Sequence, residues 1–238
     1  MRRTIYRPQL GPAFVLMLAY LIVPSAKAAL IGTVLTVPGD TVFPGLVPSG
    51  TDPGTLLASD TAPFTSTLGF NSGTLTSAVF REAGGTLDFY YQVTNNPTAP
   101  NCGQPGGQAC DPLSRETNTD FFGFVTATGF RIDGASLPGG IFVDGTVAPV
   151  TADRNAAADV VGFQFNPPDA AKIQPGQVSN VLVISTNATS FTAGNASVID
   201  GGVATVAAFE PIAVPEPTSL LLLGGGLLAV SSARRLRV

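Results

Sequence analysis

The feature that most constrains the fold is an alternating run of residues between 86 and 93. Every second position from Leu87 to Val93 is apolar, and polar residues occupy the positions between them except at Tyr90. A period of two is the pattern of a β-strand that buries one face and exposes the other. Glu82-Ala83-Gly84-Gly85 connects this run to a Thr-rich run before it. The stretch from Gly73 to Val93 therefore predicts a β-hairpin with one buried and one solvated face.

Further apolar runs predict more strands. They span residues 30–37, 122–130, 161–165, 181–184 and 203–209. The run 181–184 is apolar on both faces, as a central strand would be. Gly, Pro and Asp turn signals separate the runs, and the stretch 37–67, rich in Pro, Gly and Thr, predicts a long irregular loop. Together these patterns predict an all-β fold, a jelly-roll-like β-sandwich with long loops.

Residues 1–28 are typical of a secretory signal peptide. Three arginines precede a continuous apolar run at 13–23, and Ala26-Lys27-Ala28 fits a small-x-small cleavage site. An N-terminal membrane anchor is the alternative. The run has eleven residues, fewer than the about 20 that span a bilayer. We therefore expect a signal helix with cleavage at Ala26 to Ala28.

The C-terminal end has the features of a short transmembrane helix. Pro215-Glu216-Pro217 precedes an uncharged stretch from Thr218 to Ala233, and three arginines follow it. As a helix this stretch would be about 24 Å long, short for a hydrocarbon core of about 30 Å, so it would span with local thinning. The arginines would stay in the cytoplasm. The secretory signal directs the chain across the membrane, and the C-terminal apolar segment with its arginines stops the transfer. Residues 29–213 are therefore expected outside the cytoplasm.

These three C-terminal elements, in this order, resemble the PEP-CTERM sorting signal of exported proteins in bacteria that make exopolysaccharide. The resemblance covers residues 214–238. The residues that carry it are Pro215, Glu216, Pro217, Arg234, Arg235 and Arg237. It implies transient anchoring in the inner membrane and recognition by the membrane enzyme exosortase, with cleavage near Pro-Glu-Pro. An ordinary C-terminal anchor is the alternative. The body from Thr74 to Pro211 is also similar to cargo regions of unknown activity in proteins with this signal.

The extracytoplasmic part, residues 29–213, is acidic. It holds five basic and fifteen acidic residues, a formal charge of −10. Nucleic-acid phosphates require Lys and Arg, so this balance excludes nucleic acid as a partner. The negative charge is compatible with a protein of the cell envelope, the cell surface or the extracellular matrix, or with a protein that binds cations.

Two cysteines, Cys102 and Cys110, lie in a Gly- and Pro-rich stretch. Outside the cytoplasm such a pair typically forms a disulfide. Two metal-binding thiolates or a redox pair are the alternatives. The spacing is not C-x-x-C and the sequence has no histidine, which disfavours both. We therefore expect a disulfide that closes a short loop.

Catalytic motifs are missing. The absence of histidine removes Ser-His-Asp and Cys-His catalysis, and no nucleotide-binding glycine motif occurs. A pair of carboxylates could still serve a glycosidase. The candidates by residue type are Asp88, Asp111, Glu116, Asp120, Asp133 and Asp144. Most adjoin turn residues, so we expect no enzymatic activity.

Calcium is the one cofactor for which the sequence offers candidate ligands, since it binds six to eight oxygens from Asp, Asn and backbone carbonyls. Glu116, Asn118 and Asp120 alternate, which would place their oxygens on one side of an extended segment. A second set is Asp153, Asn155 and Asp159. No D-x-D-x-D-G loop is present, and a solvated acidic loop is the simpler interpretation.

Three functions remain open. The first is a structural or adhesive protein of the surface or exopolysaccharide matrix, with exosortase and envelope components as partners. The second is a calcium-dependent glycan-binding module that would use Tyr90 and the segment Glu116 to Asp120. The third is an extracellular hydrolase with a carboxylate pair.

Overall fold

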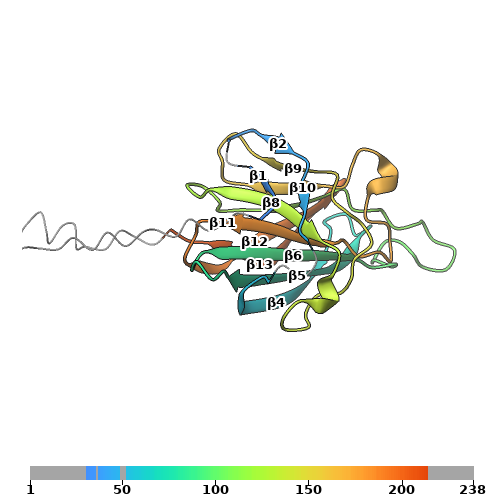
Figure 1. The fold of residues 1–238 in the computed structure, drawn as a ribbon. Helices are drawn as coiled ribbons and strands as arrows, with labels where there is room; N and C mark the ends of the chain where they lie inside the picture. Colours follow the sequence, from blue (N-terminus) through green and yellow to red (C-terminus); the bar gives the residue numbers. More distant parts are fainter. Residues whose placement is uncertain (1–30, 36, 49–51, 214–238) are drawn as a thin grey trace, which may run out of the picture.

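The protein folds into two packed β-sheets (Figure 1). A computed structural model describes residues 31–35, 37–48 and 52–213. Two mainly antiparallel sheets that pack around a main core confirm the predicted β-sandwich, while the jelly-roll connectivity stays a prediction. The predicted signal helix and C-terminal transmembrane helix fall outside the described residues. Within the described ranges, no helix has the length and apolar character to cross a membrane.

Sheet A has seven strands and sheet B has six. Sheet A runs in the order β1 (Thr33–Val34), β8 (Thr126–Arg131), β11 (Val181–Thr186), β6 (Leu87–Asn95), β5 (Ser72–Arg81) and β4 (Thr55–Thr65), and β3 (Gly45–Leu46) pairs in parallel with β8. Sheet B runs in the order β13 (Gly202–Pro211), β12 (Phe191–Asp200), β7 (Arg115–Asn118), β10 (Val161–Gln164), β9 (Thr151–Arg154) and β2 (Thr41–Val42). Two 3-10 turns lie in loops, η1 (Gly134–Ser136) and η2 (Asp169–Ala171).

The main core lies between the sheets. Inward side chains of β5, β6 and β11, such as Leu75, Phe89 and Ile184, are fully buried against Phe163 of β10 and Val206 of β13. The β5–β6 hairpin confirms the prediction for residues 73–93, with Gly73 opposite Asn95. The strand predicted at 181–184 is confirmed as a central strand, because β11 lies between β8 and β6.

The solvated face predicted for β6 is wrong. Tyr90 is fully buried, and its ring centroid lies 4.7 Å from that of Phe80 and 6.4 Å from that of Phe142. The loop after β8 returns over the outer face of sheet A and contributes Leu137 and Phe142 to a second apolar cluster. An alternating strand cannot reveal that a distant loop covers its polar face.

Two other predictions need correction. Part of the stretch predicted as a loop, 37–67, forms β4, which pairs along its length with β5 at the edge of sheet A. Pro63 and the mostly exposed or half-buried side chains of β4 are typical of an edge strand. The strand predicted at 122–130 begins only at Thr126, because the backbone from Phe121 to Phe124 forms a turn in which Phe124 N–H donates to Phe121 O at 3.2 Å.

Candidate functional site

The disulfide-closed loop forms one end of the sandwich. Cys102 and Cys110 are joined, with their Cα atoms 4.9 Å apart, which confirms the predicted disulfide. Both cysteines are buried, whereas residues 103–109 between them are exposed. In Figure 1 this loop lies at the end of the sandwich away from the C-terminal end of the described chain. We call the exposed segment Gly103–Ala109 the tip.

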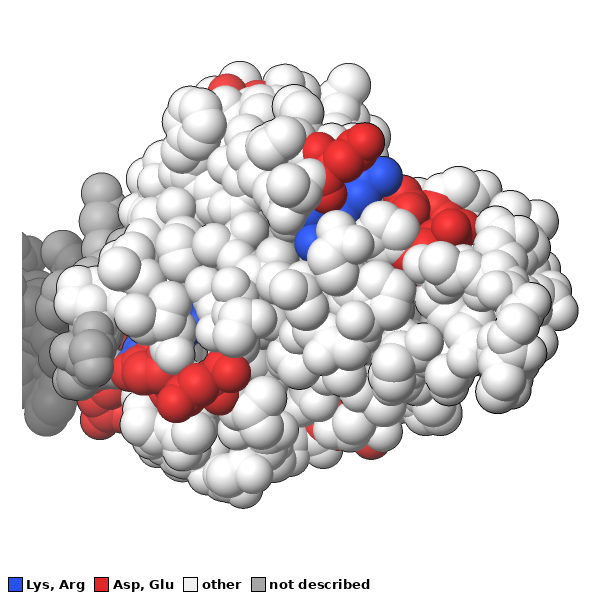
Figure 2. All heavy atoms as spheres, turned by 90° about the vertical axis from the view of Figure 1, so that its right-hand side faces the viewer, with Lys and Arg blue, Asp and Glu red and all other residues white. Residues whose placement is uncertain are grey.

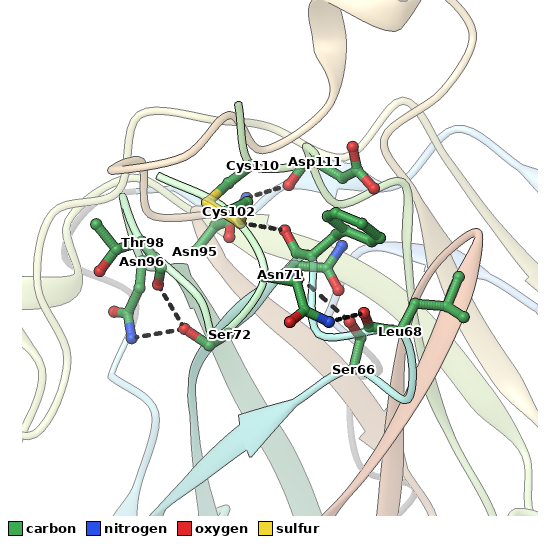
Figure 3. The surroundings of a disulfide bond; sticks show 12 residues. Ser66, Leu68, Asn71, Ser72, Asn95, Asn96, Thr98, Cys102, Cys110 and Asp111 are labelled. Carbon is green, nitrogen blue, oxygen red and sulfur yellow. Dashed lines mark hydrogen bonds between the residues drawn. A yellow bond between two sulfur atoms is a disulfide. The ribbon is translucent and has the colours of Figure 1, made fainter. Parts of the chain in front are cut away.

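Amide and hydroxyl side chains fix the base of the tip to the ends of β5 and β6 (Figure 3). Asn95 Nδ2 donates to Asp111 O at 3.2 Å, and Ser72 Oγ donates to Thr98 O at 2.8 Å. Asn101 Nδ2 donates to Leu68 O at 2.8 Å. These bonds satisfy backbone carbonyls in irregular segments, where no neighbouring strand is available. The tip is therefore held by hydrogen bonds as well as by the disulfide.

Two of the three predicted calcium ligands lie in the core. Glu116 and Asn118 belong to β7 and are each 1 % exposed. Glu116 pairs across the strands with Phe163 and Val198, both core residues, so its side chain lies between the two sheets. Asn118 Nδ2 donates to Glu116 Oε2 at 3.0 Å. Asp120 lies beyond the end of β7 and is exposed, so the three residues do not form one exposed set.

The interior strongly disfavours charge on Glu116. Burial raises its pKa to about 8, while the Asn118 hydrogen bond and the Arg115 charge lower it by less. Within the described part of the chain, Glu116 Oε1 and Asn118 Oδ1 are buried without a hydrogen-bond partner. A proton on the carboxyl would supply a donor in this region and remove the cost of a buried charge. Glu116 therefore acts as a neutral core residue near neutral pH.

Asp88 is buried on the other side of sheet A. It lies on the outer face of β6 beside Tyr90, and burial raises the pKa of Asp88 to about 8, with a further rise from the hydrogen bond and charge of Glu82. The burial of Tyr90 also removes it from the glycan-binding surface that the sequence predicted, which is a correction. Burial thus raises the pKa of both Asp88 and Glu116 to about 8, and sheet A separates the two carboxyls.

Several other candidate acids have structural partners. Asp133 accepts hydrogen bonds from Arg131 Nε and Nη2 at 3.0 and 2.9 Å, and Asp144 Oδ1 accepts one from the backbone N–H of Ala135 at 2.9 Å. Asp153 pairs with Arg115, with 2.6 Å between Nη2 and Oδ1. These carboxylates fix loops and strand edges.

Asp120 lines an open groove of about 360 Å³ at the end of the sandwich where β13 finishes. The lining residues are Asp120, Phe122, Phe124, Thr192, Glu210, Pro211, Ile212 and Ala213. Phe122 is 71 % exposed and Ile212 is 47 % exposed. The groove thus combines aromatic and aliphatic surface with two carboxylates.

The two carboxylates of the groove are held close together. Thr119 Oγ1 lies 3.1 Å from Asp120 Oδ2 and 3.4 Å from Glu210 Oε2, and Asn195 N–H donates to Glu210 Oε2 at 3.3 Å. Burial, followed by the charge and hydrogen bond of Asp120, raises the pKa of Glu210. Gly194 leaves room for this arrangement, because a Cβ there would overlap the Glu210 carboxylate.

A buried arginine positions the loop that carries Phe122. Arg154 Nη2 donates to Phe121 O at 2.6 Å and to Phe124 O at 3.0 Å, so both ends of the turn are fixed to β9. Sequence reasoning found Asp120 but missed Phe122, Glu210 and Ile212. Two clues were available: the apolar pair before Gly123, and the acid next to Pro211 just before the Pro-Glu-Pro segment.

The described residues contain no group of three or more His, Cys, Asp or Glu side chains arranged to hold a metal. Calcium binding at Asp120 stays a prediction. The cleavage residues Ala26 and Ala28 and the six predicted sorting residues lie outside the described ranges.

Comparison with known proteins locates one family resemblance. The family model of the PEP-CTERM protein-sorting motif matches residues 213–236. Comparisons with curated proteins and with solved structures found no match. The match agrees with the segment from Pro215 to Arg237 that the sequence singled out, and it begins at Ala213, the last residue lining the groove. The chain therefore carries the PEP-CTERM sorting motif, the signal of an exported protein that exosortase sorts to the cell envelope or surface.

Proposed function

We propose that the protein is a non-enzymatic component of the cell surface or exopolysaccharide matrix, and that its tip makes structural or adhesive contacts. The observation that carries this proposal is that the tip lies at the end of the sandwich opposite Ala213, the last described residue and the first residue of the sorting motif (Figure 1). The ten residues of β12 run between these ends, a distance of about 33 Å at 3.3 Å per residue. A protein sorted through its C-terminal segment would present the tip away from that segment.

The chemistry of the tip suits an uncharged, hydroxyl-rich partner. Residues 103–109 include no charged side chain, and Gln104 and Gln108 offer amide donors and acceptors. Figure 2 views the molecule from this end, and the surface is mainly uncharged, with acidic side chains in a few clusters and basic side chains between two of them. The disulfide orders the tip before any partner arrives, which reduces the entropy lost on binding. Polysaccharide is a partner of this kind.

The two carboxyls whose pKa burial raises most, Asp88 and Glu116, are poorly placed to act as the acid and base of one glycosidase site. Asp88 is buried on the outer face of sheet A and Glu116 belongs to sheet B and lies between the two sheets, so they cannot flank one substrate.

Co-sedimentation with exopolysaccharide from the source bacterium tests the role of the tip. We expect the processed protein to co-sediment both with calcium and with chelator. The double variant Gln104→Ala and Gln108→Ala should lose most of this binding, while Thr205→Ala, an exposed change on β13, should keep it. Equal binding by all three proteins would contradict a contact through the tip.

A calcium-dependent glycan-binding module is the second candidate function. The groove favours it, because Phe122 offers an exposed aromatic face beside Asp120 and Glu210. Binding in the same assay that disappears in chelator and in Asp120→Ala would select this function over the first.

Mass spectrometry tests the processing steps separately from binding. The surface protein should lack Met1 to Ala28 and the residues beyond Pro217. Released protein that still carries Arg234 and Arg235 would contradict processing at the motif.

A further inference from the structure

The groove and the sorting motif are continuous along the chain. Strand β13 ends at Pro211, and Ile212 N–H donates to Ser190 O at 3.1 Å, which fixes the direction in which the chain leaves the sandwich. Ala213 is both the last lining residue of the groove and the first residue of the matched motif. The groove is therefore the surface of the sandwich that adjoins the motif.

The short connection limits how far a processing enzyme can stay from the groove. Pro217 is four positions after Ala213. Fully extended, this connection reaches at most about 14 Å, at 3.3 to 3.6 Å per residue. The diameter of an enzyme domain exceeds this reach. An enzyme that binds Pro215 to Pro217 must therefore lie against this end of the sandwich.

We propose that the groove formed by Asp120, Phe122 and Glu210 is a docking surface that exosortase contacts while it processes the motif. This goes beyond recognition of the motif itself, because it places part of the recognition on the folded cargo. The occupant is the extracytoplasmic surface of the enzyme next to its catalytic site.

The groove defines the chemistry of that surface. Phe122 and Ile212 present apolar side chains to solvent, which an aliphatic or aromatic residue of the enzyme would cover. Asp120 and Glu210 lie beside them and are fixed by Thr119 and Asn195, so a Lys or Arg of the enzyme would complement their charge. A membrane rich in anionic lipid would be repelled by the same carboxylates, which favours a protein over a lipid surface as the occupant.

Processing of the full chain in cells that contain exosortase tests the docking surface. A pulse-chase experiment would follow conversion of the signal-cleaved chain to the form that lacks the C-terminal segment. We expect Phe122→Ser to slow this conversion about tenfold, as for loss of a central aromatic contact in an interface. The variant Asp120→Asn with Glu210→Gln, which keeps the shape of the groove, should slow it as well.

Phe43→Ser is the matched control. Phe43 is 77 % exposed and follows β2, at the edge of sheet B opposite β13. It should leave the conversion rate unchanged, with equal signal cleavage and equal melting temperature in all variants. Conversion of Phe122→Ser at the wild-type rate would overturn the proposal. So would a conversion of Phe43→Ser that is slowed as much as that of Phe122→Ser.

Two further assays distinguish exosortase from other ligands of the groove. Binding of the processed protein to phosphatidylethanolamine and phosphatidylglycerol vesicles, lost in Phe122→Ser while conversion stays normal, would assign the groove to lipid and overturn the proposal. Exopolysaccharide binding uses processed protein without the enzyme. If exopolysaccharide binding does not depend on Gln104 and Gln108 while conversion still depends on Phe122, the proposed function alone is contradicted.

Discussion

Glu116 leads to a quantitative prediction about stability and pH. Its carboxyl lies between the two sheets, 1 % exposed, and burial raises its pKa from 4.5 to about 8. Between these two pH values the native state holds a proton on Glu116 that the unfolded chain has released. The free energy of unfolding must therefore fall as the pH rises through this window. Below about 4.5 both states are protonated, and above about 8 both are ionised, so the dependence levels off.

The perturbation is Glu116→Gln, which keeps the size of the side chain and removes its titration. A pKa difference corresponds to about 1.4 kcal/mol per unit. For Glu116 this predicts a loss of about 3 kcal/mol in wild-type stability between pH 5 and pH 7.5. The amide can also donate a hydrogen bond near Asn118 Oδ1, for which no partner is recorded. The variant should therefore be the more stable protein at pH 7.5 and lose much of the advantage at pH 5.

Urea unfolding at pH 5, 6 and 7.5, with the disulfide intact, measures the effect. Asp88 has the same direction of shift, so the variant should keep part of the wild-type slope. Asp60→Asn, the same type of change at an exposed position of β4, should leave the slope unchanged. An unchanged slope in Glu116→Gln would refute the inference that the buried carboxyl is protonated near neutral pH.

Three other changes test the packing. Replacing Cys102 and Cys110 by serine should lower the free energy of unfolding by about 2 to 3 kcal/mol, as expected for a short closed loop; equal urea midpoints with and without reductant would contradict this. Phe142→Ala should cost about 3 to 5 kcal/mol, because Phe142 is 2 % exposed and packs on Tyr90; a cost under about 1 kcal/mol, the range of exposed sites, would mean that the loop does not cover sheet A. Gly73→Ala should destabilise the β5–β6 hairpin strongly, because its Cβ would lie 1.9 Å from a carbonyl oxygen of β6; a thermal melt like that of wild type would contradict the observed register.

The local patterns of the sequence predicted much of the sandwich. Alternation in residues 87–93 identified β6, because successive side chains of a strand point to opposite faces. The continuous apolar run 181–184 identified the central strand β11, because a strand buried on both faces needs no polar positions. The two cysteines identified the disulfide, because few other roles suit such a pair outside the cytoplasm. The sorting motif was equally visible, because a processing enzyme reads its residues in order along the chain.

Other features depend on residues far apart in the sequence. Tyr90 was expected to be exposed, and only the return of the loop after β8 shows that it is buried. Glu116, Asn118 and Asp120 alternate as calcium ligands would, but the first two belong to a strand that faces the core. Residue type and spacing do not reveal which face of a strand meets the opposite sheet when the residue itself is polar.

The sequence by itself determined that this is an exported β-rich protein with a disulfide and a C-terminal sorting signal. The tertiary structure decided which acids are buried, and it brought Asp120 beside Glu210 across a separation of ninety residues. It also placed their groove next to the motif and the tip at the opposite end. The physical reason is that export and strand formation depend on local residues, whereas a site depends on strand pairing that joins distant segments.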